Sequence, residues 1–189
     1  MRKLFLILAL HLVGFSHAQN FKPQISNYLE NNADEFNFEQ SDLKSFNITN
    51  KSYSKSMDLY NVYIQQNTLG VPILNAIGSF AIKENRIVSF KHSFISNLDQ
   101  KVETTSSSLS AGNVLSKISE ELNLNTNFEL LETISNQQFV YQSDISAEVT
   151  PVKLVYILTD ENKLRLAWDL SILTPDETHL WSISVDGET

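Results

Sequence analysis

The chain contains no cysteine, so neither a disulfide nor a lipid-modified cysteine can form. Its five glycines, at positions 14, 70, 78, 112 and 187, do not make a phosphate-binding loop. Basic residues are the minority, with 14 Lys and Arg against 22 Asp and Glu. This acidic balance argues against nucleic acid and anionic membranes as partners. We therefore expect a fold that its apolar core alone holds together, with an acidic surface that suits either solubility or a partner with a basic face.

Motifs for catalysis are also missing. The sequence has no G-x-S-x-G elbow and no calcium loop of alternating Asp and Asn. Acidic pairs at predicted turns and helix ends are expected to solvate the surface rather than form a catalytic dyad: Asp34-Glu35, Asp160-Glu161 and Asp176-Glu177. We therefore predict no catalytic residue, no cofactor and no metal, and hence a protein that is not an enzyme. An unrecognised hydrolase is the alternative.

The first 18 residues resemble a secretory signal. Arg2 and Lys3 precede an apolar stretch of 12 residues, and small residues precede the cleavage expected after Ala18. The alternative is a membrane anchor, but 12 residues are too few for a helix to span about 30 Å of hydrocarbon. We expect a secreted or periplasmic protein without a membrane partner after signal removal. Cleavage would leave 12 basic and 22 acidic residues.

Residues 60–94 contain three strand-like segments. Gly70 and Pro72 separate the first from the rest and keep the chain extended. A polar tip at residues 84–86 joins the other two, which predicts a hairpin. The last segment alternates cleanly, with an expected buried face made of Val88, Phe90, His92 and Phe94.

Residues 19–58 precede this sheet. A helical stripe predicts a first helix within residues 19–39, with Pro23 in its first turn and a fraying end near Asn31-Asn32; its members are Ile25, Tyr28, Leu29, Ala33 and Phe36. The polar residues 40–58 follow. In them Asp42-Leu43, with Phe46 and Ile48, predicts an extended segment leading into the first strand.

Residues 99–108 are rich in Ser and Thr and predict a linker. A second helix is expected after the N-cap Ser110, with a stripe of Ala111, Val114, Leu115, Ile118 and Leu122. Strand-like runs follow, at residues 128–134, 138–141, 152–158, 164–172 and 181–185, the third apolar on both faces as in a central strand. The pattern predicts an α+β fold of two small lobes, each a helix on an antiparallel sheet.

Part of the first half resembles the propeptide module of fungalysin and thermolysin metalloproteases, called the FTP module. The similarity lies in Asp42-Leu43, in Tyr63 to Gln66, in Gly70-Val71-Pro72-Ile73, in Asn75-Ala76 and in Ser93-Phe94-Ile95. The resemblance implies a cystatin-like lobe within residues 19–98. Its family-motif positions here are Tyr63, Gln66, Gly70, Pro72 and Asn75.

The second half resembles the PepSY-like unit that closes the same propeptides. The similarity lies in residues 164–170 with Trp168, in His179-Leu180-Trp181, and in Val185-Asp186-Gly187-Glu188-Thr189. The family often has Ala where this chain has Gly187. The resemblance implies a PepSY-like lobe over residues 109–189, with Trp168, Trp181 and Asp186 at motif positions. Trp168 and Trp181 lie in strand phase and are expected in the core.

The related proteases hold zinc with H-E-x-x-H, which this sequence lacks. His92 and His179 are expected to be partly buried sheet residues. The resemblance therefore implies a prodomain without its catalytic domain, which would assist the folding of a zinc metalloprotease and inhibit it. The partner would be that catalytic domain, with possible contacts at Trp181, Val185, Asp186 and Thr189. The alternative is a stand-alone exported binding or inhibitor module.

Overall fold

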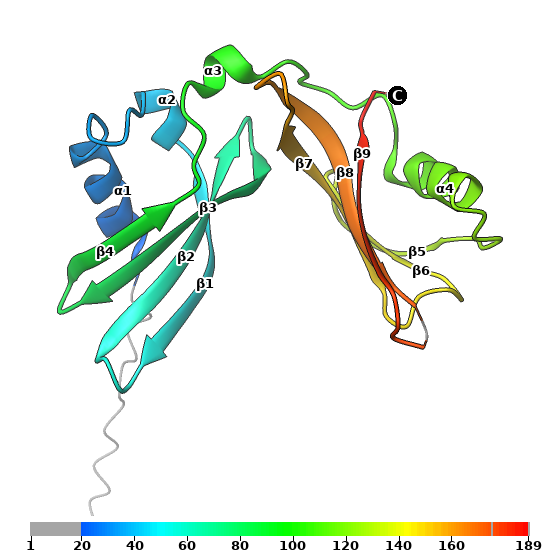
Figure 1. Ribbon diagram of the computed structural model, residues 1–189, viewed down its shortest axis with the longest axis horizontal. Coiled ribbons are helices and arrows are strands. Elements are labelled where there is room, and N and C mark those ends of the chain that lie inside the picture. Colours follow the sequence, from blue (N-terminus) through cyan, green and yellow to red (C-terminus); the bar gives the residue numbers. More distant parts are fainter. Residues whose placement is uncertain (1–19, 175, 189) are drawn as a thin grey trace, which may run out of the picture.

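The computed structural model describes residues 20–174 and 176–188. The expected signal sequence and Thr189 lie outside the described residues. The fold is α+β, as predicted, and its elements alternate between short helices and antiparallel strands (Figure 1). Their bounds are α1 Lys22–Asn31, α2 Gln40–Leu43, β1 Phe46–Ser54, β2 Leu59–Thr68, β3 Val71–Lys83, β4 Arg86–His92, α3 Leu98–Lys101, α4 Ala111–Glu121, β5 Glu129–Ser135, β6 Gln138–Gln142, β7 Thr150–Leu158, β8 Leu164–Leu173 and β9 Leu180–Asp186.

Strands β1 to β4 form an antiparallel meander in sequence order. Two-residue turns join β2 to β3 and β3 to β4, each with two positive φ angles, as right-twisted hairpins require. Helix α1 covers one face of this meander (Figure 1). Its buried residues pack on alternate strand positions, giving a first apolar cluster made of Phe21, Ile25, Leu29, Phe46, Val62, Ile64, Phe80 and Ile82.

Strands β5 to β9 pair antiparallel in the order β5-β6-β7-β8-β9, and β7 is central as predicted. Helix α4 begins at the predicted N-cap, where Ser110 Oγ accepts the Asn113 N–H at 3.2 Å. Four residues of its predicted stripe pack on the strands, but the prediction for Leu122 was wrong, since this residue follows the helix and is exposed. Helix α4 and these strands enclose a second apolar cluster. The alternating residues of β8 belong to it, namely Leu164, Leu166, Trp168, Leu170 and Ile172.

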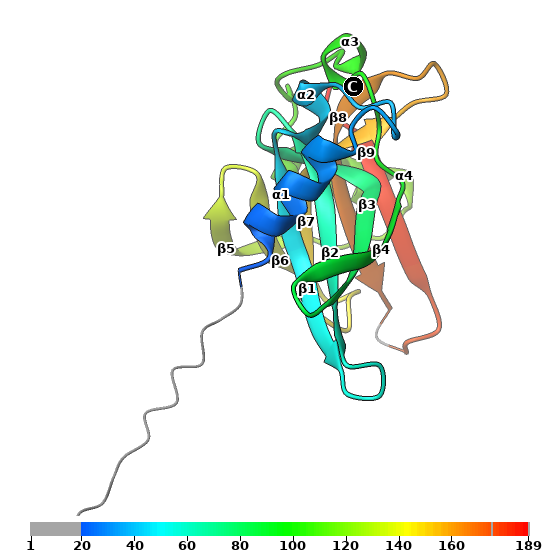
Figure 2. The same ribbon diagram turned by 90° about the vertical axis from the view of Figure 1, so that its left-hand side faces the viewer.

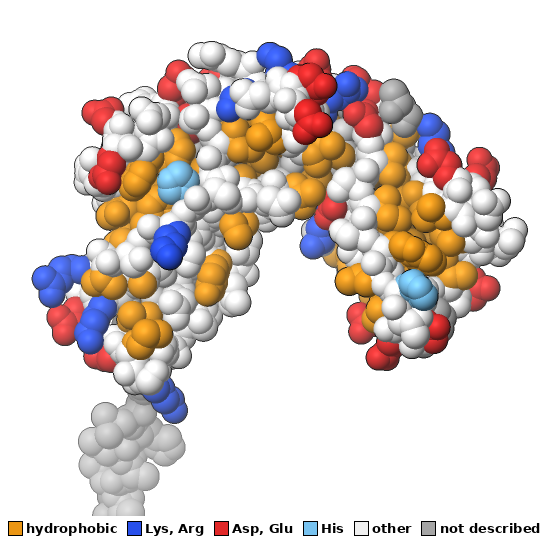
Figure 3. Space-filling view, in the orientation of Figure 1, with side chains coloured by type: hydrophobic (Ala, Val, Ile, Leu, Met, Phe, Trp, Pro, Cys, Tyr) orange, Lys and Arg blue, Asp and Glu red, His pale blue; other side chains and the backbone are white. Residues whose placement is uncertain are grey.

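One short parallel contact joins the two groups of strands. Ile73 of β3 pairs with Tyr156 of β7, so that the strands are connected as one sheet. Val71, Ile73 and Ala76 of β3 belong to the second apolar cluster rather than the first. The molecule has the shape of an arch, with its crown at this contact and a hollow beneath it (Figures 1 and 3).

Several local predictions were wrong. Asp42-Leu43 lies in the helical turn α2 instead of an extended segment, and α1 ends at Asn31, before Ala33 and Phe36. A bulge pairs Ala81 with Ser89 but Ile82 with Ile87, which leaves Val88 unpaired and 59% exposed. The predicted buried face of this strand is therefore broken, and Ile87 packs on the first cluster instead.

The segment predicted as a linker is packed against the second half. Residues 98–101 form α3, and Thr104 is buried. Thr104 Oγ1 accepts the Leu166 N–H at 2.7 Å, and its carbonyl accepts the Tyr156 hydroxyl at 2.9 Å. The side chain and the carbonyl of Thr104 therefore satisfy a backbone N–H of β8 and a side-chain hydroxyl of β7.

Candidate functional site

Two polar side chains, Asp42 and Gln66, form a buried hydrogen-bonded node where α2, β2 and the segment before α3 meet. The Asp42 carboxylate accepts three backbone N–H groups, from Glu39 at 2.9 Å, from Asn97 at 2.9 Å and from Leu98 at 2.8 Å. A carboxylate this deeply buried is tolerated because its oxygens are hydrogen-bonded. Asp42 thus ties α2 to the start of α3, more than 50 residues away in sequence.

Gln66 continues the node on the neighbouring strand. Its amide nitrogen donates to the Asp42 carbonyl at 3.0 Å and to the Ile95 carbonyl at 2.8 Å. Its amide oxygen accepts the Ile95 N–H at 2.8 Å. Positions that the sequence links only by resemblance, Asp42, Gln66 and Ile95, are therefore joined physically in one hydrogen-bonded network.

Gly70, Pro72 and Asn75 shape the strand that crosses the crown. Gly70 completes the β2–β3 turn with a φ of +79°, which suits glycine. Pro72 pairs with Asn67, whereas Gln65 pairs with Ile77, so residues 73–76 bulge away from β2. Asn75 takes a φ of 63° in this bulge, and its carbonyl accepts the Ser93 hydroxyl. The bulge frees Ile73 to pair with Tyr156.

The motif residues of the second half anchor the end of the chain. Trp168 Nε1 donates to the Leu109 carbonyl at 2.9 Å, and the indole is buried as expected. The Gly187 carbonyl accepts the backbone N–H groups of Ser108 at 2.8 Å and Leu109 at 3.0 Å. A Cβ at Gly187 would lie 2.8 Å from Ser107 Oγ and 3.1 Å from the Leu166 carbonyl, so a side chain here would force its neighbours to shift.

The predicted partner contacts lie on β9 and the tail. Trp181 and Val185 are half-buried against the second apolar cluster. The Asp186 carboxylate forms an ion pair with Arg165 Nε at 2.9 Å, and the Glu188 carboxylate forms one with Arg165 Nη2 at 2.9 Å. These side chains are therefore largely engaged within the chain, and Thr189 lies outside the described residues.

Both histidines of the described chain are exposed, so the prediction of partial burial was wrong for His92 as well, although His92 does lie in a strand, β4, with one face of its ring against aromatic side chains. His92 stacks on Phe90, with ring centroids 4.9 Å apart, and its Nδ1 accepts the Phe94 N–H at 3.2 Å. Burial of this one ring face lowers the pKa of its imidazole below the ordinary value.

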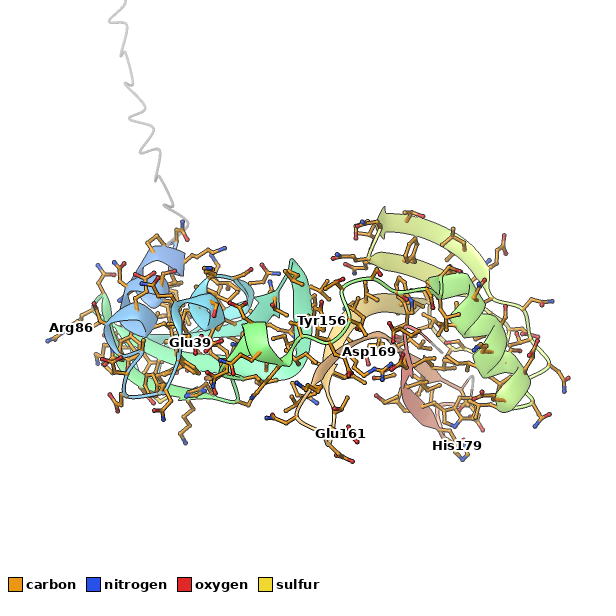
Figure 4. The ribbon with its side chains drawn as sticks, turned by 90° about the horizontal axis from the view of Figure 1, so that it is seen from above. Glu39, Arg86, Tyr156, Glu161, Asp169 and His179 are labelled. Atoms are coloured by element: carbon orange, nitrogen blue, oxygen red, sulfur yellow. The ribbon has the colours of Figure 1, made fainter. Side chains whose placement is uncertain are left out.

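His179 precedes β9 in an exposed loop and points outward, so the prediction of a partly buried sheet residue was wrong (Figure 4). The loop is closed by Asp176, which accepts the hydroxyls of Thr174 at 2.6 Å and Thr178 at 2.8 Å. These bonds lower the pKa of Asp176 to about 2. These side-chain hydrogen bonds form the turn between β8 and β9, so that β9 begins only at Leu180, after His179.

The inner face of the first half is an exposed surface with apolar residues. Val62 and Ile64 face α1, so Tyr63 between them lies on the opposite face, and Ile77 lies there by the same alternation with Phe80. Tyr63 is 40% and Ile77 53% exposed. This face looks into the hollow of the arch (Figure 3).

An open cleft of about 350 Å³ continues this surface across the crown. It is lined by both halves, through Leu74, Asn75, Ala76, Ser93, Ile95, Ile157 and Leu158. Leu158, at the end of β7, is 46% exposed. Exposed apolar residues that gather around a hollow are typical of protein-binding surfaces. We name Tyr63, Ile77 and the cleft residue Leu158 the inner apolar surface. The sequence did not single them out, because the exposure of Tyr63 and Ile77 depends on which face α1 covers, and that of Leu158 on how β7 meets the first half.

Within residues 20–174 and 176–188, no group of three or more His, Cys, Asp or Glu side chains is arranged to hold a metal ion. In the same residues, no helix has the length and apolar character needed to cross a membrane.

Comparison with known protein families and with curated proteins identifies no relative of this chain. No family model matches this chain, and a search of curated proteins finds no match.

Proposed function

We propose that this chain is the exported prodomain of a fungalysin-like zinc metalloprotease, without its catalytic domain. In this role it binds the catalytic domain, assists its folding and blocks substrate access. A module that binds only the folded enzyme stabilises the enzyme by mass action. The chain itself performs no catalysis. The two lobes would be a cystatin-like FTP module and a PepSY-like module.

The observation that supports the proposal best is the buried node of Asp42 and Gln66. Asp42, Gln66 and Ile95 lie at positions where the sequence resembles the propeptide family, and they meet in one buried hydrogen-bonded network. Gly70 and Asn75, from the same pattern, adopt the positive φ angles that let β3 change partners. A chance similarity at positions scattered along the sequence would not explain why these residues contact one another.

The inner apolar surface is the part of the chain that we assign to the enzyme. It combines exposed Tyr63, Ile77 and Leu158 with a cleft that both halves line. A partner seated in the hollow would bury these side chains, at a gain of about 25 cal/mol for each Å² of apolar surface.

An inhibition assay tests the proposal. The purified chain is added to a fungalysin-type zinc protease, and peptide hydrolysis is followed against the molar ratio. We expect stoichiometric inhibition, which Ile77→Ser combined with Leu158→Ser weakens about tenfold or more, since two buried apolar side chains are lost.

Leu122→Ser is the matched control, because Leu122 is exposed to the same degree as Leu158 but lies at the end of α4. This variant should inhibit as the parent does. No slowing of hydrolysis at about tenfold excess over the enzyme, far above stoichiometric, would count against the prodomain role and favour a stand-alone binding module.

A further inference from the structure

Strand β5 forms an unprotected edge of the sheet. It pairs with β6 and with no other strand in the described part of the chain, and all seven of its residues are exposed. In Figure 2 it projects from the side of the molecule. Such an edge presents unpaired backbone N–H and C=O groups to any extended segment that approaches it.

Exposed leucine and isoleucine side chains accompany this edge. Leu130, Leu131 and Ile134 are each about half exposed. Bulges in the β5–β6 pairing leave Leu131 and Ile134 without a partner on β6, which lets their side chains be directed away from the hairpin. By contrast, the edge strand β1 is almost entirely polar at its exposed positions, and it carries Lys51. Soluble proteins normally protect an edge in that way.

The stretch of sequence that contains β5 carries charge of a single sign. Residues 118–152 contain no Lys or Arg, but six acidic residues, namely Glu120, Glu121, Glu129, Glu132, Asp144 and Glu148. A separate open hollow of about 510 Å³, distinct from the one beneath the arch, lies at the start of β5. It is lined by Asn125, Thr126, Asn127, Glu129, Gln142, Ser143 and Asp144. Two carboxylates and several amide oxygens suit the head group of a lysine or arginine.

We propose that the β5 edge binds an extended segment of a partner protein in which apolar residues alternate with lysine or arginine. The segment adds a strand beside β5, its apolar side chains cover Leu131 and Ile134, and one cation enters the hollow beside Glu129 and Asp144. A second copy of this chain fits poorly, because it would set another Glu129 and Glu132 against the same acidic strand. The edge lies outside the inner apolar surface, so this proposal does not rest on the prodomain role.

Peptide binding to the whole chain tests this proposal. The probe is a fluorescein-labelled ten-residue peptide of alternating valine and lysine, and its counterpart has glutamate in place of lysine. We expect the basic peptide to bind about tenfold or more tighter, with a preference that salt reduces. Hydrogen exchange should slow at the β5 amides when the basic peptide binds, since added strand pairing protects them.

Two variants locate the site. Glu129→Gln with Asp144→Asn keeps the shape of the hollow, and it should weaken binding of the basic peptide about fivefold by removing two charges. Leu131→Ser with Ile134→Ser changes only exposed residues outside the strand pairing, and it should weaken binding by a similar factor. Val88→Ser, at an exposed bulge on β4, should leave binding unchanged.

Equal binding of both peptides, protection at the inner apolar surface instead of β5, or binding that neither double variant changes would overturn the proposal. So would a dimer, detected by sedimentation, that Leu131→Ser with Ile134→Ser abolishes, because the edge would then belong to a second copy. Urea unfolding of each variant shows whether the fold is retained. The charge variant is nearly isosteric and keeps the test decisive if the leucine variant unfolds.

Discussion

The two halves of this molecule share a construction and differ in charge. In each, a helix of 10 or 11 residues covers one face of an antiparallel sheet. Residues 20–96 carry seven basic and seven acidic side chains, whereas residues 97–188 carry five and fifteen. All of the net negative charge of the described chain therefore lies in the second half. The same scaffold thus presents two different surfaces, an inner face with apolar residues in a half of zero net charge and an open edge in an acidic half.

The halves also differ in how their polar connections are held. The first half is tied to α3 by a buried carboxylate, Asp42, and a buried amide, Gln66. The second half holds its connecting segment through the side chains of Thr104, Tyr156 and Trp168, and its tail through backbone groups, with Gly187 between Ser108 and Leu166. The Asp42 site should therefore be most sensitive to losing a side chain, and the tail at Gly187 to gaining one.

The largest effect is expected from Asp42→Ala. The substitution leaves three N–H groups without their acceptor in a buried site, which should lower the free energy of unfolding by about 3 kcal/mol. Urea unfolding measures it. Glu121→Ala, at an exposed position in the last turn of α4, is the control and should change stability by less than about 0.5 kcal/mol.

The same variant sharpens the comparison of the halves. Both tryptophans, Trp168 and Trp181, lie in the second half, so their fluorescence reports that half alone. Circular dichroism follows the strands of both. Coincident curves for Asp42→Ala would mean that the halves unfold as one unit, and separate curves would mean two units. A loss of stability below about 1 kcal/mol would contradict the role given to Asp42.

Gly187→Ala should give the next largest effect. The added Cβ would lie 2.8 Å from Ser107 Oγ and 3.1 Å from the Leu166 carbonyl, so the chain must shift. We expect a loss of about 2 kcal/mol in urea unfolding followed by tryptophan fluorescence. Adding Ser107→Gly should recover part of it, because only the contact with Leu166 remains. An unchanged midpoint for Gly187→Ala would show that the tail relaxes freely around the added Cβ.

The smallest effect concerns pH. Burial lowers the pKa of His92 in the folded protein, so the unfolded chain takes up a proton first as the pH falls. The stability that neutral His92 contributes is thus complete above its unfolded pKa, near 6.5, and is lost as the pH falls through the folded pKa. His92→Gln should flatten the dependence of the urea midpoint between about pH 7 and 5. An identical slope in both proteins would contradict this assignment.

Regular elements were predictable where one side chain pattern decided them. The alternation from Leu164 to Ile172 gave β8, and the sequence around Ser110 gave the start of α4, because both signals are local. The turn at residues 84–86 was likewise found from its polar residues. The helical turn at Asp42 was missed, since its carboxylate is satisfied by residues 55 and 56 positions later.

The candidate surfaces were less predictable. Leu130, Leu131 and Ile134 lie in an apolar run that could equally belong to a central strand, and only the pairing of β5 makes them exposed. Val88 was expected to be buried because a bulge, which shifts the phase of a strand by one residue, has no clear sequence signal here.

The sequence by itself determined the α+β composition, the two helical stripes, the alternation of the strands and the acidic charge, because these depend on residue type and short-range spacing. The tertiary structure decided where β3 changes partners, which face of each sheet stays open and which strand forms an edge. Those features arise from contacts between residues far apart in the chain, such as Ile73 with Tyr156 and Asp42 with Leu98. Their energy is gained only when the whole chain is folded.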